Sequence, residues 1–167
     1  ADRSPDSDTG LFCELGDFLH FDSLEAITPT SGHLLDSDTR YDRLVDVTLT
    51  TMIHSIEILA KKHKHLKVII AEGNHNLSGS VWVRKCLKRI YSGNKRIEID
   101  DTSFPYYAHN HGKIMLGFHH GHKVSNKSLP ALFASEPRYR ASWAQANYAY
   151  IHTGHTLKNE LDSSEYG

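Results

Sequence analysis

The sequence lacks any hydrophobic run long enough to cross a membrane. None of its apolar stretches approaches the roughly 20 residues that a transmembrane helix needs. The first residues also lack the charged and then apolar pattern of a secretory signal. We therefore expect a cytoplasmic protein with no membrane partner.

Cysteine and net charge are also scarce. Cys13 and Cys86 are the two cysteines among 167 residues, and they have neither disulfide-framework nor metal-ligand spacing, so we expect buried free thiols. The net charge of −1 provides no overall basic field, so any contact with nucleic acid would be local. Two basic segments, 61–67 and 84–96, are candidates for phosphate contact, although solvated helix surfaces explain them more simply.

Histidine, in contrast, is abundant, with 13 residues. The most informative stretch is Glu72-Gly73-Asn74-His75-Asn76, directly after the apolar run 66–71. This pattern is typical of a buried strand that delivers an amide and an imidazole at its C-terminal end. Three other segments repeat the design of a strand-like run, a glycine turn, and Asp or His: Leu15-Gly16-Asp17, Phe118-His119-His120-Gly121-His122 and Ile151-His152-Thr153-Gly154-His155.

These repeated segments predict a metal site assembled from strand ends, where open α/β sheets hold their ligands. Adjacent strand residues point to opposite faces, so one of His119 and His120 should reach the site. We favour His120 because it directly precedes the glycine. His63 and His65 lie in a lysine-rich stretch and are expected on a solvated helix end.

The hydrophobic pattern predicts an α/β fold in a single domain over 1–167. A three- and four-residue apolar period indicates a helix from about Thr39 to Lys64, and Ser78 can cap a second helix that ends near Ser92. A short helix is expected at 128–134. The expected strands are 11–15, 66–71, 96–100, a hairpin of 106–108 and 113–118 around the turn 109–112, and 148–151.

In chain order, these motifs resemble the calcineurin-like metallophosphoesterase superfamily: Gly16-Asp17, Gly73-Asn74-His75, His120-Gly121-His122 and Gly154-His155. The stretch from Gly16 to Asp22, Gly-Asp-Phe-Leu-His-Phe-Asp, is most similar to a phage and prophage branch. The resemblance implies a calcineurin-like phosphoesterase sandwich of two mixed β-sheets flanked by helices. It also implies a location in a bacterial or phage-infected host cytosol.

The resemblance assigns roles to the matching residues. Asp17 matches the bridging carboxylate, and Asn74 matches the neutral amide ligand. His120 and His155 match the nitrogen ligands of one metal position. His75 matches the catalytic imidazole, which does not bind metal and which stabilises the transition state or protonates the leaving oxygen. The implied cofactor is one or two divalent ions, with Mn, Zn, Fe, Ni and Mg all open.

The chain departs from the family at the other metal position. The family's Asp-x-His motif is missing before Gly-Asp, and Leu157 stands where the closing motif has its last histidine. This position keeps Asp17 and a borrowed neighbour such as His20 or His152, so we expect it to be weak or empty. Asn76 replaces the acidic residue that usually orients the catalytic histidine.

Two further expectations concern the loop and the ends of the chain. The sequence allows two roles for Asp22. Its carboxylate either accepts a hydrogen bond from a ligand histidine or lies in water, and the second role is the simpler interpretation. The family's strand with the Asp-x-His motif and the strands that follow its last histidine motif are missing, which indicates a domain trimmed at both ends or a minimal variant. A sheet that lacks a strand exposes an edge, which invites pairing with another chain, so we leave open whether the protein forms a homo-oligomer.

The leading hypothesis is therefore a metallophosphoesterase, a hydrolase that cleaves a phosphate ester. A phosphodiester is the favoured substrate, and nucleic acid is one candidate for it. The enzyme would use a metal-activated water and His75 as the catalytic imidazole. The alternative is a non-catalytic, metal-binding member of the same fold that acts as a binding or assembly module. Leu157 favours the alternative. His75 favours the enzyme, because a purely structural metal site would not need it.

Overall fold

The computed structural model describes residues 6–37 and 40–155. Its first sheet has three parallel strands in the order β1-β2-β3. Its strands are β1 (Thr9–Glu14), β2 (His65–Ile70) and β3 (Ile97–Asp100). Helix α1 (Tyr41–Lys62) connects β1 to β2, and α2 (Leu77–Ile90) connects β2 to β3. Each connection returns the chain to the start of the sheet, which makes the strands parallel.

The second sheet has the order β4-β5-β6 and is mixed. Strands β4 (Tyr106–His111) and β5 (Ile114–His119) form an antiparallel hairpin. Strand β6 (Tyr148–Thr153) pairs parallel with β5. The connection between β5 and β6 contains a short 3-10 helix, η1 (Asn126–Ser128), and the helices α3 (Leu129–Ser135) and α4 (Arg140–Gln145).

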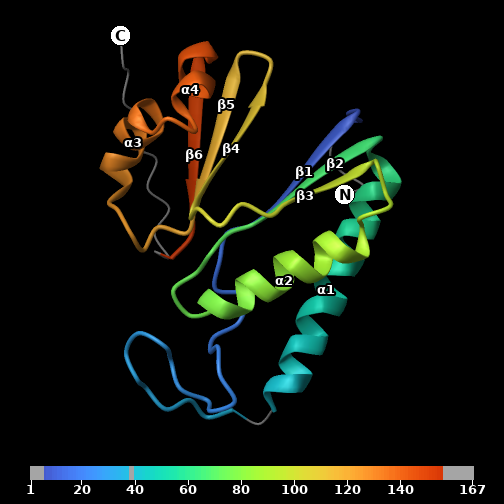
Figure 1. Cartoon of the computed structure of the whole chain (residues 1–167), viewed down its shortest axis with the longest axis vertical. Coiled ribbons are helices and arrows are strands. Elements are labelled where there is room, and N and C mark those ends of the chain that lie inside the picture. The colour runs from blue at the N-terminus through green and yellow to red at the C-terminus, as the bar shows by residue number, and fades with distance from the viewer. Residues whose placement is uncertain (1–5, 38–39, 156–167) are drawn as a thin grey trace.

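Three hydrophobic clusters join these elements into four layers. Helices α1 and α2 cover one face of the first sheet, where Ile56 and Leu87 pack with Val68. The two sheets meet through a cluster that contains Ile69 and Tyr107. Helices α3 and α4 pack on the far side of the second sheet (Figure 1). The buried residues of the cluster between them and the sheet are Tyr106, Met115, Leu129, Phe133 and Tyr139. Burying each large side chain contributes about 1.5–3 kcal/mol.

The α/β class and the helix-flanked pair of sheets agree with the prediction, but the expectation of two mixed sheets is wrong for the first. Its strands are joined by helical crossovers, and the residues described form a purely parallel sheet. None of the described helices is long and apolar enough to cross a membrane.

Several local expectations also need correction. The hairpin turn is tighter than predicted, because His109 and Asn110 pair within β4. Helix α4 was not predicted, since its six residues are too few to show a period. His63 is buried rather than solvated, and its Nδ1 lies 2.9 Å from the carbonyl oxygen of Ser7. Thr39, the predicted start of the first helix, lies outside the described residues.

The two cysteines are free thiols, as predicted, but both are only half-buried. Burial, assisted by the neighbouring Glu14 carboxylate, raises the pKa of the Cys13 thiol to about 12. This thiol therefore stays protonated near neutral pH and is a poor nucleophile and metal ligand.

Candidate metal centre

The candidate site forms where parallel strands of both sheets end. Glu14 of β1 lies opposite Ile70 of β2, and His119 of β5 lies opposite Thr153 of β6. The chain segments that follow these four strand ends contribute one side chain each to the site: Asp17, Asn74, His120 and His155. The sheets therefore place side by side residues that are up to 138 positions apart in the sequence.

The backbone at the site is unusual in two turns. Gly16 and Asp17 both have positive φ angles, of 93° and 62°, and His155 has a φ of 66°. Aspartate tolerates this left-handed region better than most residues other than glycine. The turn after β1 lets the Asp17 side chain double back toward the loop after β2.

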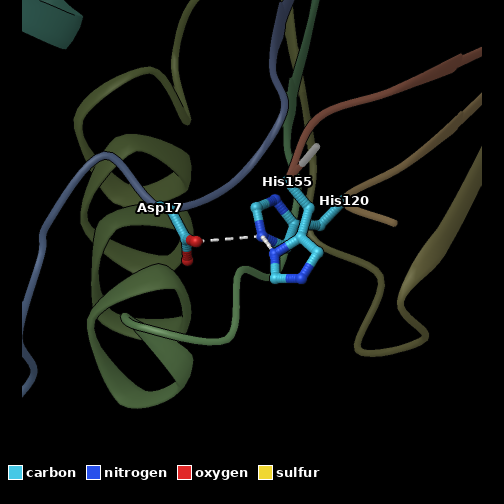
Figure 2. Close-up of side chains that lie close together, drawn as sticks. All are labelled: Asp17, His120 and His155. Atoms are coloured by element: carbon cyan, nitrogen blue, oxygen red, sulfur yellow. Dashed lines mark hydrogen bonds and ion pairs between the residues drawn. The ribbon is translucent and has the colours of Figure 1, made fainter. Parts of the chain in front are cut away.

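The side chains converge on Nε2 of His120. This atom lies 2.9 Å from Oδ2 of Asp17, 3.0 Å from Oδ1 of Asn74 and 3.2 Å from Nδ1 of His155. Figure 2 shows the Asp17 carboxylate and the His155 ring turned toward the His120 ring. The ligand atoms of Asp17, His120 and His155 all lie within 4.8 Å of one another.

The chemistry of this group fits a cation. Nδ1 of His120 lies 2.7 Å from the carbonyl oxygen of Leu15, which only accepts, so the ring hydrogen is on Nδ1. Nε2 faces a carboxylate oxygen, an amide oxygen and a second imidazole nitrogen, all of which are acceptors. A positive charge at this point, either a proton on Nε2 or a metal ion among the donor atoms, offsets the repulsion between them.

The spacing between the donor atoms also suits an ion. With metal–donor distances of about 2.0–2.2 Å, neighbouring donors in tetrahedral or octahedral shells lie about 2.8–3.6 Å apart. The three distances around His120 Nε2, from 2.9 to 3.2 Å, fall in this range. Two imidazole nitrogens and two oxygens favour zinc or a first-row transition ion over calcium or magnesium.

His75 lies beside this group without joining it. Its backbone N–H donates to Oδ1 of Asp17 (2.8 Å), while the other oxygen of that carboxylate faces His120. Its ring nitrogen Nδ1 lies 3.1 Å from the carbonyl oxygen of His20. The arrangement is compatible with the predicted role of His75 as an imidazole that does not bind the ion, and that role stays a prediction.

Two polar residues near the site have functions that the sequence did not reveal. Asn76 is 3% exposed, and its Oδ1 accepts the backbone N–H of Asp17 (3.2 Å), so it holds the turn after β1. Asp22 is neither a partner of a ligand histidine nor a free loop carboxylate. Its oxygens accept the backbone N–H groups of Ser78 (2.5 Å) and Gly79 (2.7 Å), so Asp22 caps α2 in place of the predicted Ser78 side chain.

Two more histidines line the back of the site. His119 is fully buried, and its Nδ1 lies 3.0 Å from the carbonyl oxygen of Pro105, so His120 is the member of the pair that reaches the centre. Burial, assisted by the neighbouring His120 and Lys123, lowers the pKa of His122 to about 4. Burial also lowers the pKa of His119. Neutral rings here keep positive charge away from the candidate metal centre.

The other metal position of the family has little support among residues 6–37 and 40–155. In this part of the chain, one group of at least three His, Cys, Asp or Glu side chains is close enough to share an ion, and it includes neither His20 nor His152. The His20 ring stacks on His75, and the His152 ring stacks on Phe118. Leu157 lies outside the described residues.

Many of the basic side chains proposed for phosphate contact have other partners. Lys67 pairs with Glu98 and Asp100, and both Lys85 and Lys88 pair with Asp101. Arg84 is buried and donates to the carbonyl oxygen of Ile70. Arg96 donates to carbonyl oxygens at the C-terminal end of α1. These side chains therefore serve the fold.

Comparison of the chain with protein-family models, with curated proteins and with solved structures finds no match in any of the three. The resemblance to calcineurin-like metallophosphoesterases therefore rests on the motif residues of the sequence alone.

Proposed function

We propose that this chain is a metal-dependent phosphoesterase, with phosphodiesters as the favoured substrates. One observation supports the proposal: side chains from four separate strand ends converge, with three acceptor atoms around Nε2 of His120 and a further imidazole, His75, beside them. A structural metal site needs the acceptors alone. An adjacent imidazole that is held outside the ligand group suits a reaction that moves a proton.

The residues of the site would have two roles, metal binding and proton transfer. Asp17, Asn74, His120 and His155 would hold one divalent ion, and that ion would supply Lewis acidity toward a phosphoryl oxygen. The Nδ1–H of His75 donates to a backbone carbonyl, which leaves Nε2 as the nitrogen that can carry a proton to the leaving oxygen.

The test is hydrolysis of bis(4-nitrophenyl) phosphate by the full chain, with and without manganese or zinc. We expect metal-dependent hydrolysis that falls by about 100-fold or more in His75→Ala while the metal content stays unchanged. His155→Gly, which removes a donor and keeps a residue suited to a positive φ, should lose both metal and activity. His54→Ala, on the exposed face of α1, is the matched control.

Full activity in His75→Ala would contradict the catalytic role. The alternative of a non-catalytic, metal-binding module has support from the single ligand group among the described residues. It would be favoured by stoichiometric metal binding without hydrolysis of phosphomonoesters, phosphodiesters or single-stranded DNA under the same conditions.

A further inference from the structure

The residue that follows the proposed catalytic imidazole does not orient it. The side chain of Asn76 is buried, and its Oδ1 accepts a hydrogen bond from the backbone N–H of Asp17. Asn76 therefore holds the turn after β1 and leaves the His75 ring to be held by another residue.

His20 contacts the His75 ring in two ways. Its carbonyl oxygen lies 3.1 Å from Nδ1 of His75, and because a carbonyl only accepts, this contact requires the hydrogen on Nδ1. Its imidazole lies parallel to the His75 ring, with centroids 4.8 Å apart and an angle of 11° between the planes. The hydrogen bond and the ring stack together fix the orientation of the His75 ring and leave Nε2 as its unprotonated nitrogen.

The backbone of His20 is held firmly although its side chain is exposed. On either side of it, Leu19 and Phe21 are 4% and 5% exposed. The loop is also tied at both ends to the segment that carries His75, by Asp17 to the His75 N–H and by Asp22 to the start of α2. An exposed side chain on such an anchored backbone can lie on His75 without help from the core.

We propose that His20 is a positioning residue for His75. The carbonyl of His20 selects the Nδ1–H form of the neutral His75 ring, and the stacked imidazole keeps that ring in the plane where Nδ1 meets the carbonyl. The consequence for activity rests on the proposed phosphoesterase function, whereas the positioning itself does not. Removal of a stacked aromatic ring of this kind should lower kcat by about two- to twelvefold.

The decisive variants are His20→Ala, which removes the ring and keeps the carbonyl, and His20→Phe, which keeps an aromatic ring. Nitrogen-15 NMR of the His75 ring, on the metal-free chain at about pH 8.5, reads the tautomer where an ordinary imidazole is neutral. We expect the Nδ1–H form in the wild type and in His20→Phe, and a larger share of the Nε2–H form in His20→Ala. His54→Ala should match the wild type.

Kinetics with bis(4-nitrophenyl) phosphate and manganese give the second readout. His20→Ala should lower kcat by about two- to twelvefold with KM and manganese affinity unchanged, and His20→Phe should restore kcat. An unchanged His75 tautomer in His20→Ala would overturn the proposal. A kcat in His20→Phe that stays as low as in His20→Ala would overturn it as well. A rise in KM alone would make His20 a substrate contact, and a loss of manganese affinity would make it a metal ligand. If the wild type hydrolyses nothing, the proposed function fails, and the NMR comparison still decides the positioning role.

Discussion

Gly73 is the position at which a single methyl group should do most damage to the site. A Cβ atom on residue 73 would lie 2.1 Å from Oδ1 of Asp17, 2.3 Å from its backbone nitrogen and 2.6 Å from Oδ1 of Asn76. All three distances are shorter than real Cβ contacts. Gly73→Ala must therefore push the Asp17 turn away from the loop after β2, and this breaks the bond between the Asp17 carboxylate and the His75 N–H.

The magnitude follows from the contacts that are lost. A hydrogen bond to a charged acceptor contributes about 1.5–3 kcal/mol, and overpacking costs about 1–3 kcal/mol. Because partial relaxation offsets some of this, we expect Gly73→Ala to lower the free energy of unfolding by about 3 kcal/mol in urea denaturation. Displacement of Asp17 should also weaken zinc binding by about tenfold or more in calorimetry.

Gly93→Ala is the matched control, because no atom lies within 4 Å of a Cβ at that position and its φ is not in the left-handed region. Its stability should stay within about 0.5 kcal/mol of the wild type. Equal stability and equal zinc affinity in Gly73→Ala and Gly93→Ala would show that the Asp17 turn does not depend on a glycine at position 73.

Three other predictions use the same chain. Burial, assisted by Asp17, raises the pKa of Glu14 from 4.5 to about 7, so the folded state holds a proton that the unfolded state releases and stability falls as the pH rises between these values. Glu14→Gln should gain up to about 3 kcal/mol over the wild type by pH 7 in urea denaturation, and parallel pH profiles would contradict this. Asp22→Ala should lose about 1–2 kcal/mol of stability with its helix cap, whereas Asp22→Asn should lose less; equal losses would argue against capping. Leu157→His should raise the metal content from about one ion toward two, measured by elemental analysis, and no change would show that this position does not complete a second site.

The sequence was a good guide to the elements whose pattern is local. The β-branched run before Gly73 indicates β2, and its observed bounds, His65–Ile70, differ by one residue at each end from the prediction. The apolar period before it indicates α1, which begins at Tyr41. The strand ends then identify two pairs of residues, because side chains after parallel neighbours lie at one edge of their sheet. That the two sheets bring both pairs together at His120 is shown by the structure and not by the sequence pattern.

The sequence could not reveal contacts made across long loops. Asp22 caps α2 from 56 positions earlier in the chain, and the His20 carbonyl meets a ring 55 positions later. No local pattern distinguishes such side chains from solvated loop residues. His63 was misjudged for the same reason, because its buried environment comes from Ser7 and Gly10 in the segment around β1.

We propose that Asp17, Asn74 and His155, together with Nε2 of His120, hold one divalent ion. Elemental analysis of the purified chain after equilibration with zinc and removal of free metal tests this most directly. We expect about one zinc ion per chain in the wild type and in His54→Ala, and a loss of that ion in His155→Gly. A wild-type chain without zinc, or a His155→Gly variant that retains it in full, would rule out this metal site.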